Sequence, residues 1–228
     1  MKLPEFFTPR LFRRLLIYFL GSYVLALGVS IAAKTNLGVT PMNSIAYVAS
    51  RIFIIDHGLL TAIICGCYVL FQAALEGRQF RPVSLLQIAV AMIFGWLVFL
   101  NNNLLSFFTM PDIYWVRLLC MMGSVVFIGL GIILYLRADL IPHPADGLLL
   151  AIQKKTGWKQ QNAKIFLDGT MTATAIVFSL ITTGGIVGIR EGTFIAVVGL
   201  GKTMGLFSKH LGTKIDTLFK LNESTTPP

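Results

Sequence analysis

Apolar residues are gathered into six stretches, and most charged residues lie between them. A helix needs about 20 predominantly apolar residues to cross roughly 30 Å of hydrocarbon, and each stretch is close to that length. The six stretches are residues 12–33, 58–75, 83–100, 116–136, 163–183 and 191–208. The pattern predicts an all-α membrane protein with six transmembrane helices.

The composition agrees with a chain that resides in lipid. Of the 228 residues, 55% are hydrophobic and only 13% are charged, which is more apolar than a soluble domain requires. The first apolar stretch is long and lacks a small-residue cleavage site, so we expect a retained first span. The formal net charge of +9 would suggest nucleic acid in a soluble protein. Here the basic residues lie mostly between spans, so they indicate orientation and no nucleic-acid partner is expected.

The two halves of the chain match each other at an offset of 103 residues, as an internal repeat does. Arg14-Leu15-Leu16 aligns with Arg117-Leu118-Leu119, Leu27-Gly28 with Leu130-Gly131, and TNLGVTPMNS (35–44) with ADLIPHPADG (138–147). The match predicts a first membrane repeat at residues 1–110 and a second at 111–211, followed by a cytoplasmic C-terminal tail at 212–228.

A short apolar segment follows the first span of each repeat. Pro41 and Pro144 precede these segments, and each proline follows a residue suited to a cap, Thr40 or His143. Proline suits the first helical position because its missing N–H would be unbonded there anyway. Each segment is too short to span a bilayer comfortably. The sequence therefore predicts one short re-entrant or half helix in each repeat.

Three crossings per repeat would insert the second copy upside down, as in an inverted repeat. With the N-terminus inside, fourteen basic residues face the cytoplasm, four lie outside, and Lys202 falls within a span. This bias satisfies the positive-inside rule and predicts that both termini are cytoplasmic. If the short helices crossed instead, eight spans and parallel repeats would result. The bias would then weaken but survive, so the alternative stays open.

The starts of the two short helices are the predicted site. Broken backbone at membrane depth is tolerated where protein buries it or where it lines a polar cavity. If both helices dip toward the midplane, their N–H groups and positive dipole ends would converge on an anionic or hydrogen-bond-accepting group. In the alternative interpretation, Thr40, Asn43, His143 and Asp146 only cap interfacial helices.

Three ionisable residues of the second half lie in or beside spans, namely Asp146, Asp168 and Lys202. A charge at the bilayer centre costs at least about 2.5 kcal/mol, so such residues should face the bundle interior and be paired. In one interpretation, Lys202 forms a structural ion pair with one of the aspartates. In the other, these ionisable residues contact a substrate or a coupling proton. The predicted substrate-binding residues are Thr40, Asn43, Ser44, His143, Asp146, Asp168 and Lys202.

Catalytic and metal-binding patterns do not emerge from the sequence. The three histidines are scattered, and no zinc spacing or nucleophile elbow is present. Gly201-Lys202-Thr203 ends like a phosphate-binding loop but lies inside an apolar span. We expect no enzymatic activity, no metal and no cofactor.

The repeated motif resembles a known family. NLGVTP after a basic residue, Pro-Ala-Asp-Gly at 144–147, Thr-Gly-Trp at 156–158 and Gly192-Thr193 are similar to the YczE/YyaS/YitT family of bacterial integral membrane proteins, and most similar to its YczE-like branch. The resemblance runs from about Arg14 to Leu211. It implies a multi-pass protein of the bacterial inner membrane and brings no established activity.

Two functions fit these patterns. Inverted repeats with interrupted helices commonly surround a midplane substrate site, which favours a small-solute transporter or permease. The alternative is a non-transporting membrane partner with a regulatory or scaffold role, whose centre would be filled. Expected partners are the lipid bilayer and a small solute of unknown identity, with a homo-oligomer left open.

Overall fold

The computed structural model describes residues 9–55 and 57–219, and in this part of the chain every regular element is helical. The long helices are α1 (Pro9–Thr35), α3 (His57–Glu76), α4 (Gln87–Leu104), α5 (Tyr114–Arg137), α7 (Gln160–Thr183) and α8 (Glu191–His210). The shorter ones are α2 (Pro41–Phe53), α6 (Pro144–Thr156) and α9 (Gly212–Leu218), with 3-10 turns η1 (Gly77–Gln79) and η2 (Pro82–Leu86) before α4.

The six predicted apolar stretches each fall within a long helix or its adjoining 3-10 turn. Five of these helices, α1, α3, α4 with η2, α5 and α7, are long and apolar enough to cross a membrane. The sixth, α8, has 20 residues but carries Lys202 and Lys209 and is not among the five. The sequence prediction of an all-α membrane protein is therefore confirmed, with five membrane-capable helices.

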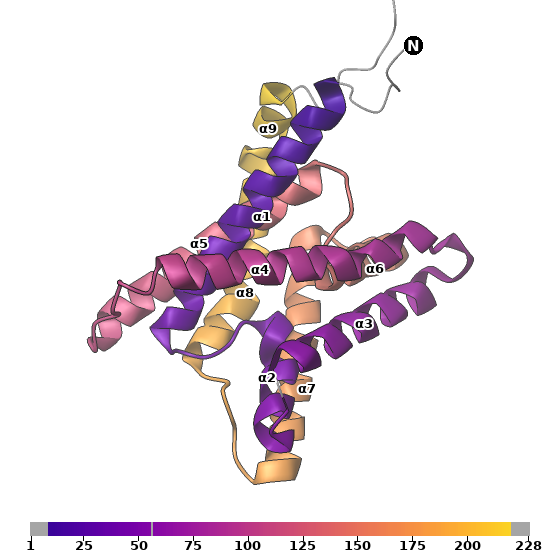
Figure 1. Ribbon diagram of the computed structural model, residues 1–228. Helices are drawn as coiled ribbons and strands as arrows, with labels where there is room; N and C mark the ends of the chain where they lie inside the picture. Colours follow the sequence, from indigo (N-terminus) through magenta and orange to yellow (C-terminus); the bar gives the residue numbers. More distant parts are fainter. Residues whose placement is uncertain (1–8, 56, 220–228) are drawn as a thin grey trace, which may run out of the picture.

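Helices α1 and α5 form the central pair of the bundle (Figure 1). Gly28 of α1 lies against Ile128, and Gly131 of α5 lies against Leu25, where an added Cβ would approach the Leu25 backbone nitrogen to 2.5 Å. Because the numbering rises along one helix as it falls along the other, the pair is antiparallel. Glycine at these positions lets the two backbones approach closely.

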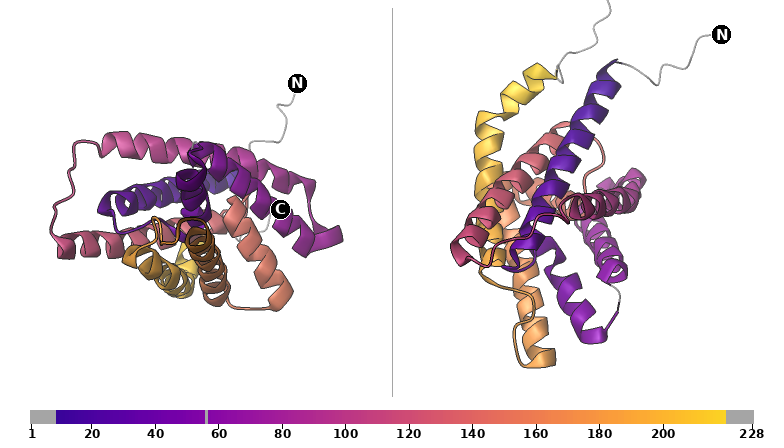
Figure 2. Two further views of the ribbon diagram at one scale, coloured as in Figure 1. Left: turned by 90° about the horizontal axis from the view of Figure 1, so that it is seen from below. Right: turned by 60° about the vertical axis from the view of Figure 1, so that its left-hand side comes forward.

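The other helix contacts occur in matching pairs, some within each half and some between the halves. Helix α4 packs on α1 as α8 packs on α5, and α3 packs on α6 as α2 packs on α7. Figures 1 and 2 show α2 beside α7 and the far end of α3 close to α6. These partnerships are preserved when α1 to α4 are exchanged with α5 to α8.

The two short helices begin where the sequence predicted. Pro41 and Pro144 each occupy the first helical position, and Thr40 and His143 precede them in extended conformation. Neither Thr40 nor His143 makes a side-chain capping hydrogen bond, so the alternative interpretation, in which the four polar residues only cap the helices, is wrong for these two. The predicted tail from residue 212 begins with α9, and residues 220–228 lie outside the described residues.

Side chains are distributed as in a membrane protein. Large apolar side chains face outward on the long helices, among them Leu70, Phe71, Met92, Trp115 and Ile181. Polar side chains are buried between the helices, among them Gln72, Gln87, Asn101 and Ser124. This arrangement leaves apolar surface for lipid and keeps polar groups inside the bundle.

Candidate functional site

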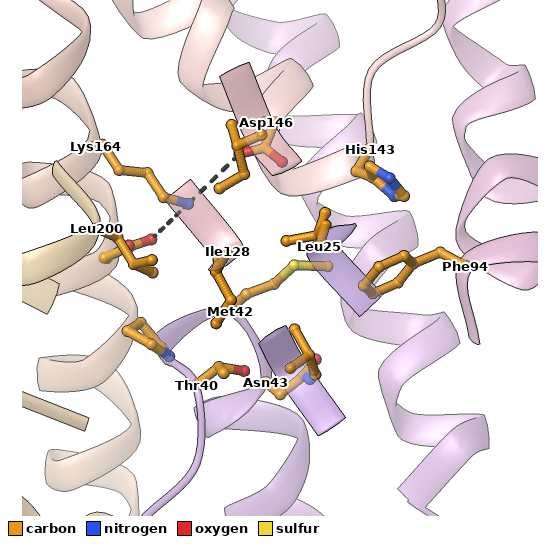
Figure 3. Close-up of a pocket in the computed structure, with 14 residues that line it drawn as sticks. Leu25, Thr40, Met42, Asn43, Phe94, Ile128, His143, Asp146, Lys164 and Leu200 are labelled. Carbon is orange, nitrogen blue, oxygen red and sulfur yellow. Dashed lines mark hydrogen bonds and ion pairs between the residues drawn. The ribbon is translucent and has the colours of Figure 1, made fainter. Parts of the chain in front are cut away.

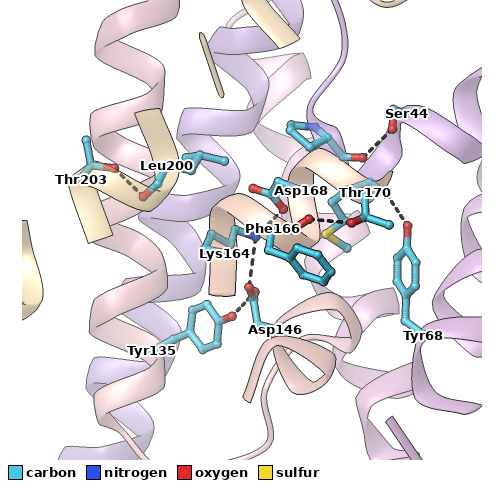
Figure 4. A network of polar contacts seen from close by, with 12 residues as sticks. Ser44, Tyr68, Tyr135, Asp146, Lys164, Phe166, Asp168, Thr170, Leu200 and Thr203 are labelled. Atoms are coloured by element: carbon cyan, nitrogen blue, oxygen red, sulfur yellow. Dashed lines mark hydrogen bonds and ion pairs between the residues drawn. The ribbon is translucent and has the colours of Figure 1, made fainter. Parts of the chain in front are cut away.

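A buried cluster of three charged side chains lies at the centre of the second half (Figure 4). The Lys164 ammonium is 3.1 Å from Oδ1 of Asp168, one turn later on α7, and 3.4 Å from Oδ1 of Asp146 on α6. All three side chains are at most 4% exposed. Each charge is expensive to bury alone, so the ion pairs are what permit the cluster inside a membrane protein.

Both carboxylate oxygens of Asp146 have hydrogen-bond donors. The Tyr135 hydroxyl on α5 donates to Oδ2, and Lys164 donates to Oδ1. Asp146 is also the third residue of α6, where the unpaired N–H groups of the first turn favour a negative charge. Both oxygens of Asp146 are therefore occupied by donors.

Asp168 is less well satisfied than Asp146. Among the described residues, neither of its oxygens accepts a hydrogen bond, although Oδ1 is ion-paired with Lys164. The side chain is 1% exposed, and buried polar atoms are rarely left without a partner. Asp168 therefore keeps an unused acceptor inside the protein.

His143 also has unused hydrogen-bonding atoms. Its ring is 2% exposed and makes edge contacts with Phe94 and Tyr135, at centroid distances of 4.7 and 4.8 Å. Within the described chain, neither ring nitrogen has a hydrogen-bond partner. Burial lowers the pKa of His143, which precedes α6, to about 4 and outweighs the opposite effect of Asp146, so the ring is neutral at neutral pH.

The starts of α2 and α6 meet at one small cavity between the two halves (Figure 3). The cavity has a volume of about 40 Å³, which suits a few water molecules or a small ion and not a metabolite. Its polar lining consists of Thr40, Asn43, His143, Asp146, Lys164 and Asp168. The predicted convergence of the two short helices is therefore present in the structure.

Two larger cavities adjoin the small one through shared lining residues. The first, of about 390 Å³, reaches from Arg190 and Asn36 to Thr40 and Asn43. The second, of about 380 Å³, is mostly apolar and lies between Asn43, His143 and α4. Volumes of this order are large enough for small molecules.

The predicted site residues divide into three groups. Thr40, Asn43, His143, Asp146 and Asp168 line the small cavity together, as expected. Ser44 is fully buried, and its hydroxyl donates to the carbonyls of Pro41 at 2.7 Å and Met171 at 3.4 Å, so it joins α2 to α7.

Lys202 is the third case, because it is exposed on α8 and does not line the cavity. The predicted ion pair of Lys202 with Asp146 or Asp168 is wrong, and Lys164 takes that place.

Lys164 was missed because it follows Lys154, Lys155 and Lys159 and was counted with the cytoplasmic loop. Two signals in the sequence could have identified it. Lys164 and Asp168 are four residues apart, which places them on one helix face. The 103-residue offset also continues into α3 and α7, whose first residues are 57 and 160.

Extended into these helices, the offset aligns Thr61 with Lys164 and Cys65 with Asp168, just as Asn43 aligns with Asp146. Asn43, Thr61 and Cys65 all line the cavity of about 380 Å³. The first half therefore has a neutral counterpart of the charged cluster of the second half.

Among the described residues, no group of three or more histidine, cysteine, aspartate or glutamate side chains is arranged to hold a metal ion. The donor set at the small cavity is two carboxylates already paired with a lysine, one imidazole, one amide and one hydroxyl.

Comparison with known proteins identifies the family. The chain is 28% identical over 185 residues to the uncharacterized membrane protein YczE of Bacillus subtilis (strain 168), covering 81% of this chain and 80% of that protein. No solved structure matches the chain. Residues 12–209 match DUF6198, a family of unknown function. The chain therefore belongs to this family, and the predicted resemblance to YczE-like membrane proteins is confirmed.

Proposed function

We propose that this protein is a small-solute transporter or permease whose site lies between two inverted repeats, and that it is not an enzyme. One observation carries the proposal: the starts of two short, proline-initiated helices and a buried charged cluster meet at one cavity between the halves. Buried ionisable residues in membrane proteins commonly mark substrate or ion pathways. Interrupted helices at a repeat interface commonly do the same.

The antiparallel packing of α1 against α5 supports inverted repeats, because corresponding helices of parallel repeats would run in the same direction. The exchange of partners between the halves supports the same arrangement. Helix α8 is the proposed sixth crossing. Its 20 residues extend about 30 Å, and it packs between α5 and α7.

The distribution of basic residues supports cytoplasmic termini in a bacterial cell membrane. Because Lys164 is buried, thirteen rather than fourteen basic residues remain on the proposed cytoplasmic side, against four outside. The bias still satisfies the positive-inside rule.

Reporters of topology placed after Phe80 and after Trp158 test this arrangement. We expect both to report the cytoplasm. Reporters on opposite sides of the membrane would require parallel repeats and would contradict the proposal.

The cavities indicate where a solute would bind. The cavity between Arg190 and Asn43 combines a cation with asparagine side chains, and the cavity beside α4 is mostly apolar. Asn43 lines both of them as well as the small cavity. We therefore place the solute against Asn43, at the start of α2.

A thermal-shift screen of the purified protein against a metabolite panel tests for a solute, and each stabilising compound is then tested for uptake in proteoliposomes. Asn43→Leu should abolish both the thermal shift and the uptake, because it removes the amide shared by the three cavities. Lys202→Met is the control, since Lys202 does not line them, and it should retain both. An unchanged response in Asn43→Leu would overturn the site assignment.

The cavities also weigh against the alternative of a non-transporting membrane partner. Such a protein requires no open space between its halves, whereas two cavities of nearly 400 Å³ adjoin the charged cluster here. Stabilising compounds that are never taken up into proteoliposomes would favour a sensing or regulatory role.

A further inference from the structure

The charged cluster is not electrically neutral. Two carboxylates and one ammonium carry a net charge of −1 when all three are ionised, and His143 is uncharged. All four side chains are buried between helices that face lipid on their outer sides. An uncompensated charge at this depth is unfavourable. One further positive charge would neutralise the cluster.

Asp146 is poorly placed to bind an additional proton or cation. Tyr135 and Lys164 already donate to its two oxygens, and it lies at the positive end of α6. A proton on Asp146 would compete with one of these donors.

Asp168 offers the vacant position. Its Oδ2 has no hydrogen-bond donor and no ion-pair partner among the described residues, and its side chain lines the small cavity. The two nitrogens of His143, which lines the same cavity, are equally unpartnered. The cavity of about 40 Å³ has room for a few waters that could connect these groups.

The other titratable groups near Asp168 do not supply the missing charge. They are Lys164 on α7, Asp146 and His143 around the start of α6, Tyr135 on α5, and Tyr68 and Cys65 on α3. Among the described residues of α2 and α8, which also pack on α7, none that lines the cavity is titratable.

We propose that the cavity between the starts of α2 and α6 is a proton site, in which Asp168 binds one exchangeable proton. The proton arrives through the cavity as hydronium: one O–H bond of the hydronium breaks, an O–H bond forms at Oδ2 of Asp168, and a neutral water molecule remains. Binding neutralises the cluster, and release restores its charge of −1. Lys164 stays paired with Asp146 in both states and holds Asp168 in position.

The site lies where a proton could be coupled to a solute, because Asn43 and His143 line both the small cavity and the cavity of about 380 Å³. This coupling rests on the proposed transport function. The proton site itself does not, since it follows from the charge and the unpartnered atoms of the cluster.

Infrared difference spectra of the purified protein, recorded between acidic and alkaline samples without solute, test the proton site. We expect the carbonyl stretch of a buried protonated carboxylic acid in the wild type and its loss in Asp168→Asn. Asp112→Asn is the control, because the Asp112 side chain is fully exposed, and it should retain the band. A wild type without the band, or a band that survives in Asp168→Asn, would overturn the proposal.

A second variant keeps the test decisive if Asp168→Asn does not fold. In protein labelled with carbon-13 at the aspartate carboxyl groups, the band should show the isotope shift. Asp168→Glu keeps an acid at this position but carries no label, so its band should return to the unlabelled frequency. A band that keeps the isotope shift in Asp168→Glu would place the proton on another aspartate.

A sodium ion could occupy the cavity in place of the proton. Spectra recorded in sodium buffer and in choline buffer of the same ionic strength distinguish a proton site from a sodium site. We expect the same band in both buffers. Suppression of the band by sodium, together with thermal stabilisation by sodium, would replace the proton with a metal cation and overturn the proposal. Failure to find transport in proteoliposomes would leave these spectra unaffected, so the two proposals fail separately.

Discussion

Replacing Lys164 with methionine removes the only cation of the buried cluster and keeps a side chain of similar length. In the native structure Lys164 lies 3.1 Å from Asp168 and 3.4 Å from Asp146, with all three side chains at most 4% exposed. The variant leaves two buried carboxyl groups without a cation. Asp146 keeps its hydrogen bond from Tyr135 but loses its ion-pair partner.

Removal of one partner of a buried ion pair typically costs about 3–5 kcal/mol. We expect Lys164→Met to lower the free energy of unfolding by an amount in this range. Asp146→Asn in the same background should recover much of the loss, because it removes the carboxylate that was left unpaired and retains a side chain that Tyr135 can contact. The two substitutions should therefore be strongly non-additive.

Unfolding by sodium dodecyl sulfate in mixed micelles, followed by tryptophan fluorescence, measures these differences. Lys202→Met is the matched control, since it makes the same chemical change at an exposed position of α8, and it should alter stability by less than about 0.5 kcal/mol. If Lys164→Met were as mild as Lys202→Met, or if the losses from Lys164→Met and Asp146→Asn simply added, the assignment of Lys164 as the partner of Asp146 would be refuted.

Two further predictions use the same unfolding measurement. Tyr135→Phe removes the hydroxyl that donates to Asp146 and should cost about 1.5–3 kcal/mol, whereas Tyr18→Phe, whose hydroxyl donates to a neutral carbonyl at 2.8 Å, should cost about 0.5–1.5 kcal/mol; equal losses would contradict a charged acceptor. Gly131→Ala places a Cβ against α1 and should cost about 1–3 kcal/mol through overpacking. Gly123→Ala on the same helix meets nothing within 4 Å and should be neutral or stabilising, so equal losses would argue against the close crossing.

The helices were predictable because their signals are local. Each long apolar stretch has few polar residues that could be left without partners in lipid, and Pro41 and Pro144 mark the starts of the two short helices. The 103-residue offset showed that the two starts occupy corresponding positions in the two halves. Four of the predicted site residues follow from this symmetry and line one cavity, namely Thr40, Asn43, His143 and Asp146.

The sequence-based prediction named Lys202 instead of Lys164 as the partner of the buried aspartates. It failed because this pairing depends on helix packing, which local sequence does not reveal. A helix that is apolar on all sides gives no indication of which face turns inward, so Lys202 could not be oriented from its neighbours. Lys164 was interpreted as part of a basic loop, although α7 begins at Gln160 and already includes it. Only the packing of α6 against α7 brings Lys164 to Asp146.

The two halves share a scaffold but differ in the chemistry at its centre. At the repeat offset, Asp146, Lys164 and Asp168 correspond to Asn43, Thr61 and Cys65. A second charged copy would bring four carboxylates and two lysines to the same region. The region would then carry a net charge of −2, and its carboxylates would repel one another in a bundle with few polar partners. With one charged and one neutral half, the proposed proton site lies in the second half alone, and the first half lines the neighbouring cavity with Asn43, Thr61 and Cys65.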